Sequence, residues 1–408
     1  MDFHFEKTKA ICLHILLSIV YFLAGCLIIP SIGLLYRFLW LKFGSKVKPS
    51  AKKAIVITGA TSGIGLALAK RFYRRGFTVF ATYHSTDRPG YDELRGIISK
   101  QNVNDEADPY VPKLFLVHID VRSELSIDVA ANEIERLTGK YQLELYSVVC
   151  NAAVVSDCCF EINELENIHA TVQTNILGTM MVAKRFTRLI INSKGRIVIV
   201  SSLGYRMMIP FFSVYTATKS ALVSFADCLN EDLQRYGASC RCVCPGNLLN
   251  KSNIVFTAAN CLQDSAASLS SEERELYKGA IEDNNCFLDK YLRSRLNQIK
   301  EDPKRMADLY AVDLPKNKRG LRYTRKTFMI DWLYSFVDGS SPDNNDADEM
   351  GALTAFDHAV CLKNPPRRCY CGNRSLQYIM GPLIGEYMPQ VVVSVLHHLL
   401  EDRLTGRI

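Results

Sequence analysis

The sequence predicts an α/β fold, a Rossmann-like doubly wound parallel sheet that is extended at both ends. Three observations predict it. Short apolar runs rich in β-branched residues alternate with helical patterns, a glycine-rich turn joins the first run to the first helical pattern, and only one repeating strand–helix series is visible in 408 residues. Length alone would suggest two or three domains, so the excess residues must lie at the ends and in an insertion.

The predicted strands are short apolar runs typical of a parallel sheet that is buried on both faces. They lie near residues 54–58, 77–82, 114–119, 145–150, 195–201 and 238–244, with a seventh around 367–371. Helical patterns between them supply right-handed crossovers. These lie near 62–75, 91–100, 123–138, 165–192 and 213–236, and further helices are expected near 271–300 and 347–361.

The N-terminal region predicts a membrane anchor. Residues 11–29 contain no acid and no lysine, and apolar character resumes after Pro30 as far as Leu41. Roughly 20 apolar residues cross a bilayer, and this run is too long for a cleaved signal peptide, although a hairpin broken at Pro30 is an alternative. Two lysines precede the span and six basic residues follow it. By the positive-inside rule, the folded domain should face the cytosol.

Composition argues against two classes of site. The net charge of +7 is modest and no basic helix is interleaved with aromatic residues, so we expect attachment to an anionic membrane surface and no nucleic-acid partner. Cys369-Tyr-Cys371 lacks a histidine pair, so no metal site is expected.

The segment from Ala54 to Gly65 predicts a phosphate-binding turn. An apolar strand runs into Thr58-Gly-Ala-Thr-Ser-Gly-Ile-Gly65 and then directly into a helical pattern. In such a turn, the first glycine permits the tight bend, the second lets the backbone approach a pyrophosphate, and the third allows close helix packing. The residues expected to hold the cofactor here are Gly59, Thr61, Ser62, Gly63, Ile64 and Gly65.

Tyr215 and Lys219 predict proton-transfer chemistry. Residues four apart share one face of a helix, so the Lys219 ammonium can lie under the Tyr215 phenol. A tyrosine titrates near ~10, and we expect the lysine together with an oxidised nicotinamide to lower that pKa. Ser202, at the end of an apolar run, can hydrogen-bond the oxygen whose proton Tyr215 takes.

Several motifs in one order identify a resemblance. The chain carries Thr58-Gly59-x-x-x-Gly63-x-Gly65, then Asp120, Asn151-Ala152, Asn175, Ser202, Tyr215, Lys219 and Pro245-Gly246. With these motifs, residues 50–400 resemble the short-chain dehydrogenase/reductase family. Segments 76–81, 89–95 and 356–389 are similar to its membrane-bound branch, which includes 17β-hydroxysteroid dehydrogenase type 2, 11β-hydroxysteroid dehydrogenase type 2, retinol dehydrogenases and 3-hydroxybutyrate dehydrogenase.

The resemblance implies roles for particular residues. Asp120 would hydrogen-bond the adenine amine with Val121 against the ring, or Asp120 could simply cap a helix before Ser123. Asn175 would bend its helix and hold a water in a proton relay to Lys219, which would also hold the nicotinamide ribose. The cofactor site would be completed by Asn151, Ala152, Tyr215, Pro245 and Gly246.

Two positions depart from the family pattern. The usual Asn-Asn-Ala-Gly reads Cys150-Asn151-Ala152-Ala153 here, and Asn250 stands where a threonine usually follows Pro-Gly. The cofactor is expected to be NAD, with NADP as the alternative, because Ser62 and Tyr83-His84 offer no fixed cation for a 2′-phosphate.

The substrate side should be apolar. Its wall is expected to comprise Val155, Leu203, Gly204, Met207, Met208, Ile209, Pro210, Phe211 and Phe212. Beside a membrane anchor, such a wall predicts a lipophilic alcohol or ketone, such as a steroid or retinoid, although ordinary core packing is the alternative. The first helices after Pro245 are expected to form a substrate lid. The basic stretch 316–326 is either a membrane-docking insertion or a solvated loop.

The predicted organisation is therefore an anchor and basic linker (1–48), a cofactor-binding and catalytic domain (49–250), and a lid, basic insertion, last strand and apolar tail (251–408). We expect an oxidoreductase of the endoplasmic reticulum membrane, with mitochondrial or luminal placement as alternatives and a homodimer as a further expectation. Rival functions are an NADPH-dependent reductase of fatty-acyl or sphingoid ketones, a 3-hydroxybutyrate dehydrogenase-like enzyme, and a catalytically idle membrane scaffold that binds cofactor.

Overall fold

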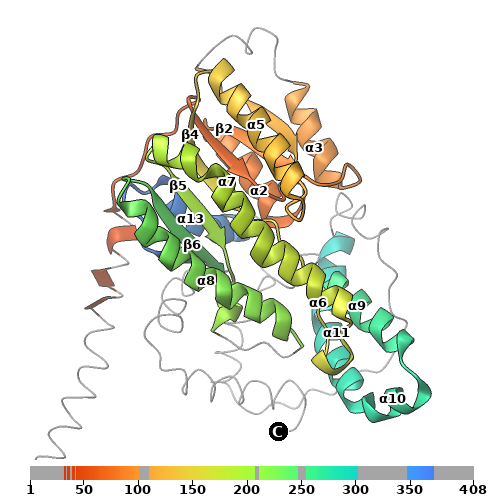
Figure 1. Ribbon diagram of the computed structural model, residues 1–408. Helices are drawn as coiled ribbons and strands as arrows, with labels where there is room; N and C mark the ends of the chain where they lie inside the picture. The colour runs from red at the N-terminus through yellow and green to blue at the C-terminus, as the bar shows by residue number, and fades with distance from the viewer. Residues whose placement is uncertain are drawn as a thin grey trace, which may run out of the picture.

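The computed structural model describes residues 44–100, 110–206, 211–246, 254–301 and 347–371, together with parts of 32–43. Seven parallel strands form one sheet in the order β3-β2-β1-β4-β5-β6-β7 (Figure 1). The strands are β1 (Lys53–Ile57), β2 (Thr78–Tyr83), β3 (Leu114–His118), β4 (Glu144–Cys150), β5 (Arg196–Val200), β6 (Ser239–Pro245) and β7 (Arg368–Cys371). The predicted α/β class is confirmed, and each strand lies within two residues of its predicted position.

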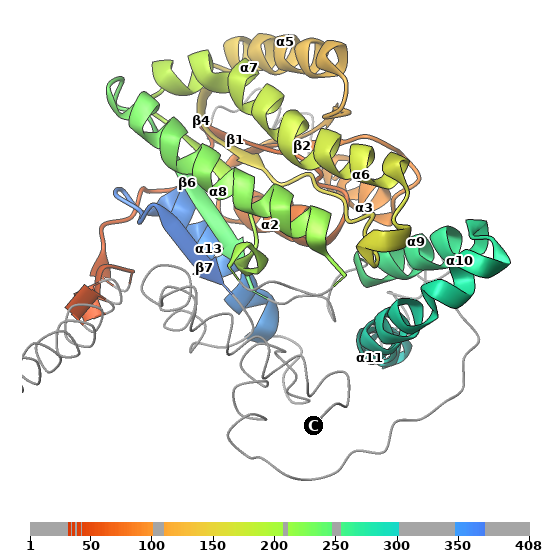
Figure 2. The same ribbon diagram turned by 60° about the horizontal axis from the view of Figure 1, so that its bottom comes forward.

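Helices cover both faces of this sheet, as Figures 1 and 2 show. One face carries α5 (Glu124–Lys140), α7 (Thr179–Asn192) and α8 (Ser213–Gln234), and the other carries α2 (Gly63–Arg74), α3 (Pro89–Ile98) and α13 (Ala347–Cys361). Both α13 and β7 follow residue 250. The edge strand of the sheet and one helix of its second face therefore come from a part of the chain far beyond β6.

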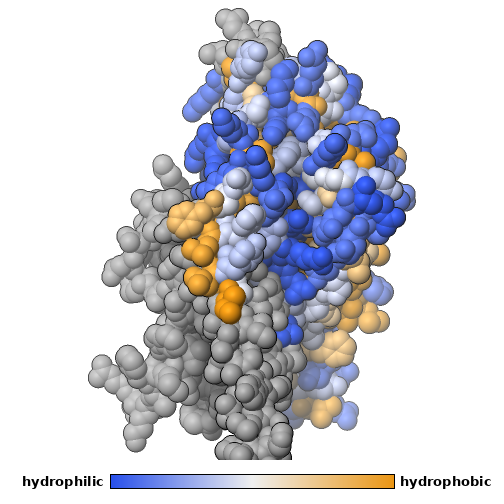
Figure 3. Space-filling view, turned by 90° about the vertical axis from the view of Figure 1, so that its left-hand side faces the viewer, coloured by the Kyte–Doolittle hydropathy of each residue, from blue (hydrophilic) through white to orange (hydrophobic). Residues whose placement is uncertain are grey.

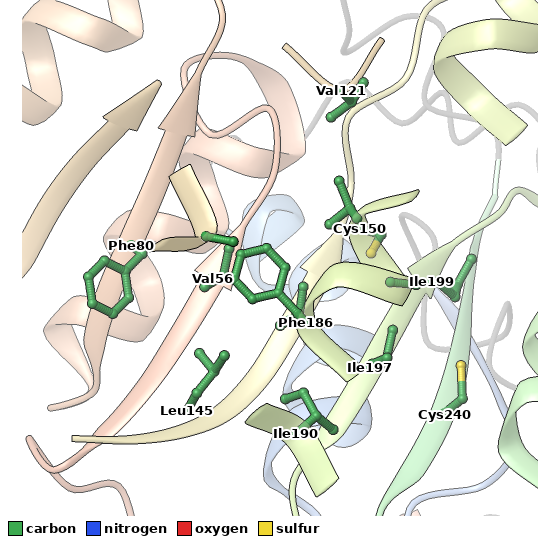
Figure 4. Close-up of a cluster of buried hydrophobic side chains, with 14 of the residues drawn as sticks. Val56, Phe80, Val121, Leu145, Cys150, Phe186, Ile190, Ile197, Ile199 and Cys240 are labelled. Carbon is green, nitrogen blue, oxygen red and sulfur yellow. The ribbon is translucent and has the colours of Figure 1, made fainter. Parts of the chain in front are cut away.

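The core consists of two hydrophobic clusters separated by the sheet. Along β1, Ala54 and Val56 belong to one cluster, whereas Ile55 and Ile57 belong to the other. This alternation follows from the two-residue period of a strand, and it explains why β1 reads as a continuous apolar run. Phe186 of α7 packs toward the strand side chains of the first cluster (Figure 4).

The predicted helix 165–192 is interrupted. It consists of α6 (Leu165–Val172), a π-helical turn η2 (Gln173–Gly178) and α7. The turn contains Asn175, which was expected to bend its helix. Such π-turns often occur at functional sites, because they redirect one side chain without ending the helix.

A separate helical unit follows the sixth strand. It comprises α9 (Ile254–Ser268), α10 (Ser271–Leu276) and α11 (Lys278–Glu301). In this region the sequence predicted helical structure only near 271–300, so α9 was missed. Phe256, Leu262 and Leu288 of this unit form a third cluster with residues of the loop after β4 and of the start of α8. The unit therefore packs beside the N-terminus of α8, where Tyr215 lies.

The N-terminal linker is hydrogen-bonded to residues at and just beyond the end of α13. The Trp40 indole donates to the Asn364 carbonyl at 2.7 Å, the Val47 amide donates to the Cys361 carbonyl at 2.6 Å, and Lys363 donates to Ser45 at 2.8 Å. Because the first predicted strand begins only at residue 54, the sequence predicts that removal of residues 1–48 costs a membrane contact and no core packing. This expectation is wrong, because Val47 also packs against the second core cluster.

An apolar strip lies on the surface beside this linker. Figure 3 shows hydrophobic residues gathered along one edge of the described surface, and Ile32, Leu35 and Phe43 are 63%, 59% and 71% exposed. Of the helices that the structure describes, none has both the length and the apolar character needed to cross a membrane. The predicted span 11–29, the basic stretch 316–326 and the apolar tail lie outside the described residues.

Candidate active site

The predicted site residues meet at the carboxyl edge of the sheet. The glycine-rich turn follows β1, Asp120 follows β3, Asn151 follows β4 and Ser202 follows β5. Parallel strands place all these ends on one side, where open α/β sheets bind their ligands. In the described part of the chain there is also a surface groove between β3 and α5. None of the predicted site residues lines it, so it is separate from this site.

The glycine-rich turn has the geometry of an anion cradle. Gly59 and Gly63 adopt positive φ angles of 64° and 48°. A Cβ on Gly63 would meet nothing within 4 Å, so its backbone faces open space, whereas a Cβ on Gly65 would lie 2.1 Å from the Gly59 carbonyl oxygen. The N-cap of α2, Ser62, makes no side-chain cap, and the first turn contains no acid. Free N–H groups and a positive helix end therefore fit a pyrophosphate.

Asn151 and Thr58 hold this turn in place. The Asn151 side chain donates to the Thr58 carbonyl at 2.9 Å, and the Thr58 hydroxyl accepts from the amides of Asn151 and Ala152 at 2.8 and 2.9 Å. Asn151 was expected to bind cofactor, and here it organises the loop that would do so. No role was expected for Thr58, although it is the first residue of the turn motif.

Asp120 is paired with a cation. Both of its carboxylate oxygens accept from the Arg122 guanidinium, at 3.0 and 2.8 Å, and these hydrogen bonds hold the pKa of Asp120 below its usual value. The alternative expectation that Asp120 caps α5 is wrong. The cap is Ser123, whose hydroxyl accepts from the Ser126 amide at 3.2 Å. Asp120 remains the first carboxylate after β3, with Val121 next to it.

Arg88 is a cation near the end of β2 that was not among the predicted site residues. Tyr83 packs against Tyr91 and His118, with ring centroids 4.8 and 5.5 Å apart. Burial lowers the pKa of His84, and the nearby Arg88 lowers it further. Arg88 is the N-cap of α3, and a Cβ on Gly90 would lie only 2.2 Å from the Thr61 carbonyl oxygen. The start of α3, including Arg88, therefore lies beside the glycine-rich turn.

Ser202, Tyr215 and Lys219 come together, as their spacing predicted. Tyr215 and Lys219 share one face of α8, and the Lys219 Nζ lies 5.5 Å from the centre of the Tyr215 ring. The hydroxyls of Ser202 and Tyr215 are hydrogen-bonded to each other. Lys219 is 3% exposed and donates to the Val200 carbonyl, at the end of β5, at 2.9 Å.

The electrostatics of this group differ from the expectation. Burial raises the pKa of Tyr215 to about 12, and the hydrogen bond from Ser202 opposes only part of that rise. Burial also lowers the pKa of Lys219 to about 8. The expected lowering of the tyrosine pKa invoked Lys219 and an oxidised nicotinamide together. The protein groups by themselves give the opposite direction, because desolvation dominates and the ammonium is bonded to Val200.

Asn175 connects the π-helical turn to the catalytic helix. It is fully buried, and its side chain accepts from the Val154 amide at 2.9 Å and donates to the Val154 carbonyl at 3.0 Å. It also donates to the Thr218 hydroxyl at 3.2 Å, which in turn donates to the Tyr215 carbonyl at 2.7 Å. Asn175 therefore supports the backbone of Tyr215 through Thr218.

The residues expected to form the substrate wall have different surroundings. Val155 and Phe212 are each 2% exposed and pack inside the third core cluster. Phe211 has a positive φ of 66° and packs edge-on against Phe287 of α11, with ring centroids 5.8 Å apart. Leu203 is partly buried against the first core cluster. Residues 207–210 and 247–250 lie outside the described part of the chain.

Asp157 is a buried carboxylate that the sequence analysis passed over. It is 1% exposed, and one oxygen accepts from the Tyr215 amide at 2.8 Å. The one signal that could have found it is the residue before α8, Phe212, which cannot cap a helix with its side chain. A helix that begins without its own cap must find acceptors elsewhere.

Comparisons with known proteins agree with this geometry. A family model described as short chain dehydrogenase matches residues 53–257, half of the chain. The mitochondrial D-beta-hydroxybutyrate dehydrogenase of Bos taurus is 31% identical over 207 residues, which cover 51% of this chain and 57% of that protein. Estradiol 17-beta-dehydrogenase 2 is 32% identical in Rattus norvegicus, covering 88% of this chain and 77% of that protein, and 33% identical in Mus musculus, covering 50% of each. The chain thus spans about half the length of two of these relatives.

Proposed function

Because the chain belongs to the short-chain dehydrogenase family, whose members are oxidoreductases of CH–OH groups with a nicotinamide nucleotide, we propose that it interconverts a lipophilic alcohol and its ketone or aldehyde. The observation that carries this proposal is the arrangement of Ser202, Tyr215 and Lys219 at the carboxyl edge of the sheet, beside the glycine-rich turn. An idle scaffold would have no need to keep a buried lysine beside a hydrogen-bonded tyrosine.

The proposed roles follow from the contacts. Tyr215 donates its proton to the substrate oxygen in the reduction, and takes it back in the oxidation. Ser202 holds that oxygen next to the tyrosine hydroxyl. Lys219, at 5.5 Å from the ring centre, supplies the positive charge that favours tyrosinate when the hydroxyl ionises. The nicotinamide, when bound, accepts or supplies the hydride. A tyrosine pKa of about 12 makes the protonated acid the resting form of these protein groups.

The substrate class is proposed from the apolar surroundings of Tyr215. The ring centre of Phe212 lies 6.4 Å from that of Tyr215, and Phe287 connects Phe212, at 6.1 Å, with Phe211, at 5.8 Å. The two kinds of relative are named for an estradiol and for hydroxybutyrate, which differ greatly in size and polarity. Apolar surroundings on this side of Tyr215 favour a steroid- or retinoid-like alcohol over a small hydroxy acid, which needs a fixed cation for its carboxylate.

A substrate panel tests the function. Detergent-solubilised protein is assayed with steroid alcohols, retinol and short hydroxy acids, each with NAD and with NADP, in both directions. Turnover of a steroid or retinoid at well above the hydroxy-acid rate is the expected result. Exclusive turnover of hydroxybutyrate would replace the proposed substrate class, and no turnover with any compound, despite cofactor binding, would favour the scaffold.

We propose NAD as the cofactor, and Arg88 provides the test. Two cations lie near His84, but Arg122 is paired with Asp120, so of these two only Arg88 can serve a 2′-phosphate and the protein should prefer NAD. Arg88→Ala should leave the KM for NAD unchanged and reduce kcat/KM for NADP by about 10-fold. This factor corresponds to the loss of one hydrogen bond to a charged group. Arg95→Ala, an exposed arginine of the same helix, is the control. A wild-type enzyme that prefers NADP would show that Arg88 is sufficient to hold the 2′-phosphate although Arg122 is paired with Asp120.

Membrane attachment through residues 11–29 is also proposed, with the catalytic domain cytosolic. A chain starting at Ile32 should leave the membrane fraction and still bind cofactor, whereas one starting at Lys52 should also have a lower melting temperature. The second cut removes the bonds of Trp40, Ser45 and Val47 to the end of α13. Sedimentation and thermal melts measure the two effects. Equal melting temperatures would mean that these bonds contribute nothing to stability.

A further inference from the structure

The backbone of Tyr215 is held on both sides by side chains from other parts of the chain. Its amide donates to the Asp157 carboxylate at 2.8 Å, and its carbonyl accepts from Thr218 at 2.7 Å. The second oxygen of Asp157 accepts from the Asn163 side chain at 2.9 Å, and the amide of Val214 also donates to this carboxylate. Asp157 is therefore saturated with neutral donors, two of which belong to the first turn of α8.

The helix that carries Tyr215 has no cap of its own. Its N-cap residue, Phe212, makes no side-chain hydrogen bond, and the first turn contains no acidic residue. The N–H groups of a first turn have no partner within the helix, and the partial positive charge at that end favours a carboxylate. Asp157, 58 residues earlier in the chain, supplies both the acceptor and the negative charge.

Asp157 also connects the catalytic helix to the helical unit that follows the sheet. The side-chain oxygen (Oδ1) of Asn163 accepts from the Cys261 thiol of α9 at 3.8 Å. The titratable groups around Asp157 are Cys158 and Cys159 on its own loop, Tyr215 on α8, and Cys261 with Asp264 on α9, and none of these is a cation. The carboxylate is therefore balanced by amide N–H groups and the helix end alone within this part of the structure.

We propose that Asp157 is a positioning residue for the reaction: from the loop after β4 its carboxylate fixes the first turn of α8 and thereby sets where the Tyr215 hydroxyl meets the substrate oxygen. This role rests on the proposed function, because it assumes that Tyr215 transfers the proton. A displacement of about 1 Å at such a group can cost on the order of 100-fold in rate.

Burying the Asp157 carboxylate costs free energy of folding. This cost allows a positioning role in the reaction to be distinguished from a purely structural role. Burial raises the pKa of Asp157 to about 6 from 3.8, while the hydrogen bonds from the Tyr215 and Val214 amides oppose the rise. A carboxyl group whose folded pKa lies above its unfolded pKa binds more protons in the folded state between those two values. Its contribution to stability therefore grows as pH falls from 6 to 3.8, and the ionised form opposes folding at neutral pH.

Asp157→Asn is the central test. The amide has the same size, its oxygen can accept from the first turn of α8, and its NH₂ can donate to Asn163 if the Asn163 amide turns over. Only the charge is lost. We expect kcat to fall by about 10- to 100-fold, with cofactor affinity within about twofold and the melting temperature at pH 7 unchanged or higher. We also expect wild-type kcat to decline below pH 6, and this decline to disappear in the variant.

A matched control and a second variant keep the test decisive. Glu161→Gln removes the same charge from an exposed site four residues away and should change neither rate nor pH profile. Asn163→Ala removes one donor that lowers the Asp157 pKa, so the acid limb of kcat should move to higher pH. This holds even if Asp157→Asn fails to fold.

Two results would overturn the proposal: wild-type kcat and pH profile in Asp157→Asn, or an acid limb that stays in place in Asn163→Ala. A parallel loss of rate, cofactor affinity and melting temperature would assign Asp157 to stability only. A failure of the proposed function would give a different result. Tyr215→Phe would then keep its activity, whether or not the Asp157 variants lose theirs.

Discussion

Replacing Tyr215 with phenylalanine is expected to reduce kcat by about 10²- to 10⁴-fold, the usual value of a group that transfers a proton in the transition state. The substitution removes one hydroxyl and its hydrogen bond with Ser202. The ring can keep its packing on Phe212, and the backbone keeps its bonds to Asp157 and Thr218. Cofactor affinity should therefore stay close to that of the wild type.

The measurement is steady-state kcat, together with a fluorescence titration of the reduced cofactor. Tyr236→Phe is the matched control, because Tyr236 is 52% exposed just beyond the end of α8. Near-normal turnover by purified Tyr215→Phe would remove Tyr215 from the mechanism. A large loss of cofactor affinity would instead assign it to binding.

The features that were predictable from the sequence have short-range signals. The seven strands are mainly apolar runs of four to seven residues. Successive side chains of a strand point to opposite faces of the sheet, so a continuous apolar run predicts a strand that is buried on both faces. The glycine-rich turn needs positive φ at Gly59 and Gly63, and few other residues accept that conformation. Tyr215 and Lys219 meet because four residues make about one helical turn. In each case the local sequence determines the geometry.

The features that were missed depend on contacts between distant segments. Asp157 reaches Tyr215 across 58 residues, and Trp40 reaches Asn364 across 324 residues. No local pattern encodes such pairs. The π-helical turn is a partial case. The family resemblance implied a bend at Asn175, but the sequence 165–192 is continuously compatible with an α-helix, and only the fit of Asn175 against Val154 shows the extra residue.

The pKa of Tyr215 was expected to fall because a neighbouring ammonium favours tyrosinate, and this physical effect is real. The spacing predicts that Lys219 lies on the same side as the ring, but it cannot predict that the ammonium donates to Val200 or that desolvation dominates. Burial must be known before the sign of a pKa shift can be stated.

Lys219→Met should be the second most damaging substitution, and it should not damage the fold. Methionine has a similar length and no charge, so the variant loses the cation beside Tyr215 and the bond to Val200. We expect kcat/KM to fall by about 100-fold or more, the pH optimum to move upward and cofactor affinity to weaken. Lys219→Arg should restore little, because a planar guanidinium does not fit a site 3% exposed.

Stability should respond in the opposite direction to activity. The pKa of Lys219 is about 8 in the folded protein, lowered by burial from 10.5. A lysine whose folded pKa is depressed binds fewer protons in the folded state between pH 8 and 10.5, so its contribution to stability rises with pH across that window and its charge opposes folding below it. Lys219→Met should therefore melt no lower than the wild type at pH 7. Thermal melts at pH 7 and pH 9, with exposed Lys184→Met as the control, measure this. A variant that is both inactive and unstable at pH 7 would show that Lys219 serves the fold first, through its bond to the end of β5.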